Sequence, residues 1–123
     1  MESKPGWKAV FYTTEAGRCP VLEAIRQLPT ADRVEIGQTL RLVQEEGPDV
    51  GMPFTERVSD EIGAVRVRVG RTRWRLLFFT HVGKELVILH MFAKKTPAIP
   101  RREIEIAQRR RTDWLRREVR QYG

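Results

Sequence analysis

Arginines at every second position mark two neighbouring segments of this chain. Side chains two residues apart lie on the same face of a β-strand, and the residues between them lie on the other face. The sequence therefore predicts the two strands of a hairpin, with its turn at residues 70–72. If the apolar sides of both strands pack into one core, the register brings four guanidiniums together on the opposite side. We call this set the arginine face: Arg66, Arg68, Arg73 and Arg75.

The arginine face predicts an anionic ligand. Five arginines and no carboxylate lie between Val65 and Arg75. Like charges that close together repel one another, and an anion bound among them offsets this repulsion. Clustered basic side chains are typical of sites that bind polyanions. The alternative is the solvated outer face of a half-buried sheet, which usually carries charges of both signs.

The basic charge of the chain belongs to its second half. The net charge is +7 over 123 residues, yet residues 1–62 carry 7 lysines and arginines against 11 carboxylates, and residues 63–123 carry 16 against 5. Arginine outnumbers lysine by 18 to 5, which favours phosphate recognition through the fork of the guanidinium group. A membrane surface is the competing polyanion, but no long apolar run and no lipidation signal supports it.

Composition also bounds the compartment and the kind of site. The start of the chain does not resemble a secretory leader, so we expect a cytoplasmic protein with no membrane partner. The single cysteine, Cys19, excludes an internal disulfide and a cysteine-based metal site. No carboxylate pair or histidine cluster has the spacing of metal ligands, so we expect neither a metal nor another cofactor.

Hydrophobic periodicity predicts one α+β domain over residues 1–123, with the element order β-αα-βββ-α. The expected strands are residues 7–12, 63–70, 73–80 and 85–92. A helical hairpin is expected between Pro20 and the stop at Gly47-Pro48, with Thr30 as the cap of its second helix. Residues 49–62 are expected to form a loop and a short extended piece, and Pro53 argues against a central strand there. We therefore expect an antiparallel sheet with the helices on one face, including a basic C-terminal helix that begins at Pro100.

His90 lies within the nearly continuous apolar strand expected at residues 85–92. Period-two alternation places it on one face with Ile88, Phe92 and Lys94. A histidine in such a strand is commonly a hydrogen-bonded core residue. Its neighbour Lys94 on the same face also makes it a candidate general acid or base. Both interpretations stay open at the level of sequence.

Three motifs, spread over nearly the whole chain, carry a resemblance to a known family. They are Phe11-Tyr12-Thr13-Thr14 with Gly17-Arg18-Cys19-Pro20-Val21, the run Trp74-Arg75-Leu76-Leu77-Phe78, and Leu89-His90-Met91-Phe92-Ala93-Lys94-Lys95-Thr96-Pro97 through Pro100 with Glu103-Ile104 and Ala107. Together they resemble the phage-derived HigB branch of the RelE/ParE toxin superfamily. One departure is that this branch usually carries Glu-Leu-Arg where the present chain has Arg66-Val67-Arg68.

The resemblance implies a RelE-like sandwich and the toxin of a type II toxin–antitoxin system. Such a toxin is a ribosome-dependent mRNA endonuclease that arrests translation, and its partners are the ribosome, mRNA and a cognate antitoxin, here expected to be a small helix-turn-helix protein. RNA is cut without a metal when its own 2′-hydroxyl attacks the adjacent phosphate, and positive groups around the phosphorane stabilise it. The expected catalytic residues are Arg68, Arg75, Lys94 and Lys95. The expected RNA-binding residues are Arg66, Arg71, Arg73 and Arg101.

Arg75 is expected to stabilise the phosphorane from a position that faces solvent or ligand. Arg75→Ala should then abolish cleavage and leave the fold intact. The basic C-terminal helix is expected to dock on ribosomal RNA, unless its arginines form only a solvated face. The helix arginines in question are Arg109, Arg110, Arg111, Arg116 and Arg117.

Two other classes of function remain open. The first is a non-catalytic toxin of the same fold that inhibits a protein target such as gyrase. The second is a nucleic-acid-binding module without catalysis, which needs the positive charges of the arginine face but not their convergence on one phosphate.

Overall fold

The computed structural model of this protein describes residues 6–122, with side chains through residue 120. The first residues, on which the expectation of no leader rests, lie outside the described part. The elements in chain order are β1 (Lys8–Phe11), α1 (Pro20–Arg26), α2 (Thr30–Glu46), β2 (Thr55–Arg57), β3 (Gly63–Val69), β4 (Thr72–His81), β5 (Glu85–Ala93) and α3 (Arg101–Tyr122). Among the described residues, no helix combines the length and the apolar character needed to span a membrane.

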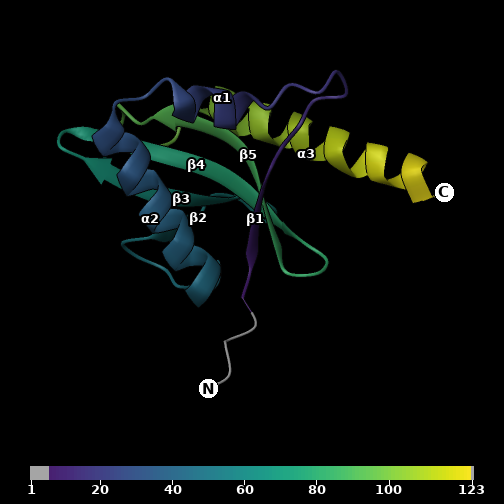
Figure 1. The fold of residues 1–123 in the computed structure, drawn as a ribbon, viewed down its shortest axis with the longest axis horizontal. Helices are drawn as coiled ribbons and strands as arrows, with labels where there is room; N and C mark the ends of the chain where they lie inside the picture. The colour runs from purple at the N-terminus through teal and green to yellow at the C-terminus, as the bar shows by residue number, and fades with distance from the viewer. Residues whose placement is uncertain (1–5, 123) are drawn as a thin grey trace.

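The five strands form one mixed sheet in the order β1-β5-β4-β3-β2 (Figure 1). The pairs from β2 to β5 are antiparallel, but β1 runs parallel to β5. The expectation of a purely antiparallel sheet is therefore wrong. No tight turn joins β1 to β5, so hairpin geometry does not fix their relative direction. The expected order β-αα-βββ-α also lacked β2, a three-residue edge strand that follows Pro53.

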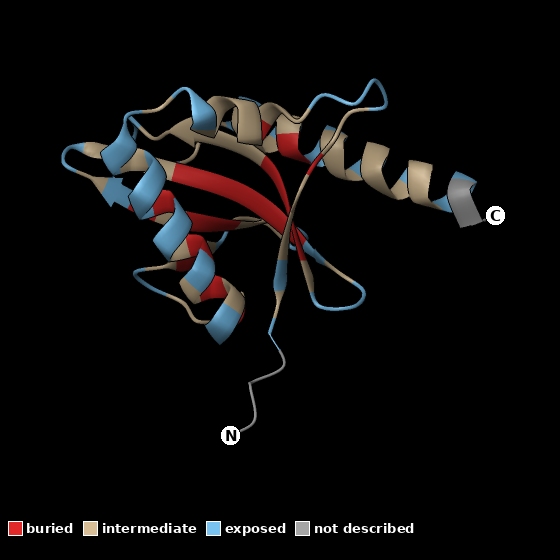
Figure 2. Cartoon of the chain, in the orientation of Figure 1, coloured by how far each residue is buried: buried red, intermediate tan, exposed pale blue. Residues whose placement is uncertain are grey.

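The helices cover both faces of the sheet, which corrects the expectation of helices on one face. Helices α1 and α2 pack against one side in a core that contains Val21, Ile36, Val65, Leu76 and Ile88. Helix α3 packs against the other side through Ala107, with Tyr12, Leu77, Phe79, Val87 and Leu89. Both β4 and β5 are apolar on both faces over their central residues, so each face needs cover. Figure 2 shows the buried residues gathered in the sheet and the outer side of α2 exposed.

The second helix of the hairpin has defined first and last residues, but Thr30 is not its N-terminal cap as expected. Thr30 is the first helical residue, and Pro29 occupies the capping position without a side-chain hydrogen bond. Helix α2 ends at Gly47, whose φ of 97° favours glycine, and the Gly47 N–H donates to the Val43 carbonyl at 2.7 Å. On the sheet side, the Trp74 indole N–H donates to Asp32 at 2.8 Å. This bond ties α2 to β4.

A bulge in β5 decides which face His90 occupies. Leu77 pairs with His90 and Phe78 pairs with Ile88, so Leu89 has no partner on β4. Ile88 belongs to the core under α1 and α2, whereas His90 lies on the α3 side. Simple alternation placed His90 and Ile88 on one face, and that expectation is wrong. The extra residue reverses the alternation at this point and turns His90 toward α3.

Candidate functional site

The β3–β4 hairpin assembles the arginine face as predicted. Arg66 pairs directly with Arg75, and Arg68 pairs directly with Arg73. The two-residue turn begins with Gly70, whose φ of 59° suits the first position of a tight hairpin turn. Val67 and Trp74, which lie between the arginines, pack into the core under α1 and α2. The arginine face therefore lies on the α3 side of the sheet.

Arg75 is buried, with only 3% of its surface exposed. Its Nε donates to Oε2 of Glu56 at 3.0 Å, and its terminal nitrogen donates to the Trp74 carbonyl at 3.1 Å. Burial is the main cause that lowers the pKa of Arg75, and the neighbouring charge of Arg66 lowers it further. The expectation that Arg75 faces solvent or ligand is wrong, because the carboxylate of the edge strand β2 lies against its guanidinium.

Glu56 is the internal counter-ion of the arginine face. Its Oε2 lies 3.0 Å from Nε of Arg75 and 3.4 Å from Nε of Arg66. Arg66 is half-buried and also donates to the Pro53 carbonyl at 3.1 Å. One carboxylate is thus shared by two guanidiniums. The inner half of the arginine face is fixed by protein groups before any ligand binds.

The outer half of the arginine face is exposed. Arg68 and Arg73 are both solvent-accessible, and no carboxylate in the described part of the chain pairs with either of them. The Lys94 backbone N–H donates to the Arg73 carbonyl at 2.7 Å, so the pairing of β5 with β4 continues to Lys94. Alternation from Phe92 puts Lys94 on the arginine face. Arg68, Arg73 and Lys94 thus form a row of cations open to a ligand.

The remaining expected residues surround the arginine face. Arg71 is exposed in the hairpin turn, and Lys95 is exposed just beyond β5. Arg101 is the first residue of α3 and lies 3.9 Å from Glu105 on the exposed side of the helix. The register places none of these three side chains on the arginine face.

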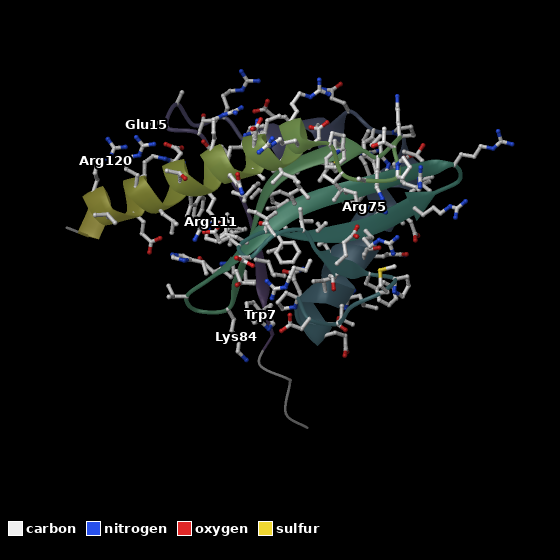
Figure 3. The ribbon with its side chains drawn as sticks, turned by 180° about the vertical axis from the view of Figure 1, so that it is seen from behind. Trp7, Glu15, Arg75, Lys84, Arg111 and Arg120 are labelled. Carbon is white, nitrogen blue, oxygen red and sulfur yellow. The ribbon has the colours of Figure 1, made fainter. Side chains whose placement is uncertain are left out.

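Figure 3 shows how α3 lies relative to Arg75. The helix crosses the sheet near Arg111 and continues toward Arg120, whereas Arg75 lies toward the opposite end of the view. His90 marks the boundary, because its Nε2 lies 2.7 Å from Oε1 of Glu103 in the first turn of α3. Burial is the main cause that lowers the pKa of His90 below its ordinary value of 6.5.

The arginines of α3 divide into two groups. Arg110 and Arg117 each lie 5.6 Å from the centre of the Tyr12 ring, and Arg111 lies 5.3 Å from that of Phe79. These three hold the helix to the sheet. The exposed side carries Arg102, Arg109 and Arg116. The expected RNA-docking set therefore mixed packing residues with accessible ones.

The sequence analysis did not identify Glu56 as part of the site, and it did not identify Glu103 as the partner of His90. Glu56 lies in the segment expected to be a loop with a short extended piece, where no periodicity marks the residues that pair with a strand. Glu103 was expected to belong to the C-terminal helix motif and to complement the dipole at the start of that helix, but a bond between distant segments leaves no local signal. Within residues 6–122, no group of three histidine, cysteine, aspartate or glutamate side chains is arranged to hold a metal ion.

Comparison with models of protein families identifies a match. The sequence model of the phage-derived Gp49-like proteins (DUF891) matches residues 23–112. The matched segment begins in α1, contains the whole sheet except β1 and ends within α3. It includes the arginine face, Glu56, both lysines after β5, and the His90–Glu103 pair. No curated protein matches the chain.

Proposed function

We propose a function from the premise that this chain belongs to the Gp49-like family of phage-derived proteins, a family of toxin–antitoxin toxins of the RelE/HigB type. The protein is a HigB-like toxin that cuts mRNA on the translating ribosome without a metal ion. Its cognate antitoxin is a small helix-turn-helix protein. The observation that carries this proposal is the arginine face, where cross-strand pairing places two exposed and two fixed guanidiniums side by side.

The two halves of the arginine face have different tasks in this reaction. Arg68 and Arg73 are exposed and bind the scissile phosphate and its neighbour, with Lys94 beside them. Arg75 and Arg66, held by Glu56, lie behind them and add fixed positive charge. Guanidiniums that are already in place stabilise the phosphorane without reorganisation at the moment of reaction. Lys94 or Lys95 protonates the departing 5′-oxygen.

The arginine face favours RNA cleavage over the other two classes of function. A gyrase-type inhibitor has no need of cations that converge from two strands on one surface. A simple binding module needs the charges, but gains nothing from an acid–base group beside them. His90 provides such a group at the edge of the arginine face.

Primer extension on translating and non-translating transcripts tests the proposal. The parent protein should cut ribosome-bound mRNA within codons and should leave free mRNA nearly intact. Arg73→Ala should lower the cleavage rate by about 10²–10³-fold, the usual loss when one preorganised donor is removed. The matched control is Arg41→Ala, because Arg41 is an exposed arginine of α2 on the other side of the sheet, paired with Glu45 at 3.2 Å.

Three results would contradict the proposal. Equal cleavage of free and ribosome-bound mRNA would show that cleavage does not require the ribosome. Cleavage by Arg73→Ala at the rate of the parent protein would show that the arginine face takes no part in the reaction. RNA binding without any cleavage by the parent protein would identify a binding module instead.

A further inference from the structure

We propose that His90 is the general base of this cleavage and that Glu103 is its positioning residue. The inference rests on the proposed function, and it names the group that takes the proton from the 2′-hydroxyl. It starts from a contact between two elements, since His90 belongs to β5 and Glu103 to the first turn of α3.

The contact fixes the histidine ring in one orientation. His90 Nε2 lies 2.7 Å from Oε1 of Glu103, and the two side chains are 14% and 12% exposed. A carboxylate only accepts hydrogen bonds, so Nε2 carries the proton and donates it. The other ring nitrogen, Nδ1, then has a free lone pair. This is the tautomer that a base needs, and Glu103 selects it.

The surroundings of His90 keep the ring neutral and therefore able to accept a proton. Burial is the largest influence on its pKa and lowers it, and the charges of Arg110 and Arg102 act in the same direction. Glu103 acts in the opposite direction, through its hydrogen bond and its charge. On the strands, His90 faces Leu77 directly and Phe92 beside it, neither of which can carry a charge.

His90 lies beside the inner half of the arginine face, which is the half nearest to it on β4. Its cross-strand partner Leu77 is two residues from Arg75 on β4, a rise of about 7 Å, and four residues from Arg73, a rise of about 14 Å. Phe92 pairs with Arg75, and its ring stacks on His90 with the centres 5.8 Å apart. The attacking 2′-hydroxyl and the scissile phosphate belong to adjacent positions of one nucleotide. The scissile phosphate must therefore lie between the guanidinium of Arg73 and the ring of His90, over Phe92 and Arg75, with its 2′-hydroxyl toward His90.

The proton balance of the step is complete with these residues. Nδ1 of His90 takes the proton of the 2′-hydroxyl, and the freed oxygen attacks the adjacent phosphorus. The bond from phosphorus to the 5′-oxygen breaks, which leaves a 2′,3′-cyclic phosphate, and the 5′-oxygen takes a proton from a lysine of the site. Glu103 stabilises the imidazolium that forms, as a carboxylate behind a histidine base does.

The test is single-turnover cleavage of ribosome-bound mRNA as a function of pH. His90→Gln should lower the rate at its plateau by about 10²–10⁴-fold. Glu103→Gln should lower it at least about tenfold. It should also move the acidic limb of the pH profile to lower pH, because the carboxylate that raises the pKa of His90 is gone. The control is Glu105→Gln on the exposed side of α3, which should keep the parent rate and profile.

Ribosome binding and the tautomer supply independent readouts. Sedimentation with ribosomes should be equal for the parent protein and all three variants. Nitrogen NMR of histidine-labelled protein should show the proton of His90 on Nε2, with His81→Gln used to assign the signals. This measurement needs no substitution at the site.

The outcomes separate this inference from the function on which it rests. If the parent protein cleaves and Glu103→Gln keeps both its plateau and its acidic limb, Glu103 has only a structural role. If His90→Gln cleaves at the parent rate, or if the proton lies on Nδ1, His90 is not the base. Absence of cleavage by the parent protein overturns the proposed function and this inference together.

Discussion

Arg73 and Arg75 lie two residues apart on the same face of β4, yet their surroundings differ. Arg73 is exposed and has no carboxylate partner among the described residues, whereas Arg75 is buried against Glu56. The same substitution should therefore have different effects at the two positions. The exposed arginine is available to a ligand, and the buried one supports the hairpin that carries both.

Arg75→Ala should lower the free energy of unfolding by about 2 kcal/mol. It removes a buried side chain and leaves Glu56 with only Arg66 as a partner. Arg73→Ala should change the free energy of unfolding by less than about 0.5 kcal/mol, as exposed substitutions commonly do. Urea denaturation measures both values. Equal stability of the two variants would contradict the structural role of Arg75, and the sequence-based expectation that its loss spares the fold would then be correct.

Helix α3 combines packing and exposed arginines in adjacent positions. Arg117 donates to Asp113 at 3.1 Å and to the Thr13 carbonyl, and it lies over the Tyr12 ring. Tyr12 in turn donates its hydroxyl to Asp113 at 2.6 Å. Arg116, the preceding residue, is exposed. Because the two arginines are neighbours of identical type, they are controls for each other.

Arg117→Ala should lower the free energy of unfolding by about 1–2 kcal/mol, since two hydrogen bonds and a ring contact are lost. Arg116→Ala should leave the melting temperature unchanged. It should instead weaken ribosome binding and reduce the slope of log K against log salt by about 1, the value for one phosphate contact. Thermal melting and ribosome sedimentation at several salt concentrations measure these effects. An unchanged salt slope would identify the exposed side of α3 as a solvated face.

Local patterns predicted most elements but not their arrangement. The alternation of Arg66, Arg68, Arg73 and Arg75 with apolar residues was enough to predict both strands and their register. The same alternation failed at His90, because a single extra residue at Leu89 changes the face and leaves no mark in the composition. The side occupied by α3 is set by long-range packing. A period of two or of 3.6 identifies an element and does not identify its neighbour.

In the candidate site, too, the residues that are close together in sequence were predicted and those that meet only in the folded protein were not. Its cations were predicted because they cluster in sequence, on one hairpin and at the end of β5. Glu56 lies 19 residues from Arg75 along the chain, and Glu103 lies 13 residues from His90. These anions meet their cations only through tertiary contacts. The charge of the site was therefore predictable, and its internal neutralisation was not.

At the scale of the whole molecule, the described residues that link α3 to the sheet include both histidines of the chain. His90 pairs with Glu103 near the start of the helix, and His81 lies 2.5 Å from Glu118 near its end. Partial burial lowers the pKa of His90 below 6.5, so the folded protein favours its neutral form. Folding stability must therefore depend on pH.

The sign of this dependence follows from proton binding. Between the lowered pKa of folded His90 and the ordinary value near 6.5, the unfolded chain binds more protons than the folded protein. Stability from His90 is therefore fully present above pH 6.5 and is lost as the pH falls through the folded pKa. Melting temperatures should fall over this window, and His90→Gln should reduce the fall. An equal fall of the melting temperature in the parent protein and in His90→Gln would show that another titratable group causes the pH dependence.

The parallel pairing of β1 with β5 has a consequence for synthesis of the chain. Residues 8–11 find their partners only after residues 85–88 have been made, and Tyr12 waits longer still for Asp113, 101 positions later. A nascent chain folds from its N-terminus wherever local contacts allow it, but this strand has no sheet to join until late. Stalled nascent chains that end before β5 should be cut by protease within residues 8–12, and chains that include α3 should resist. The sheet is therefore complete only after β5 has been made, and the Tyr12–Asp113 hydrogen bond forms only after residue 113 has been made.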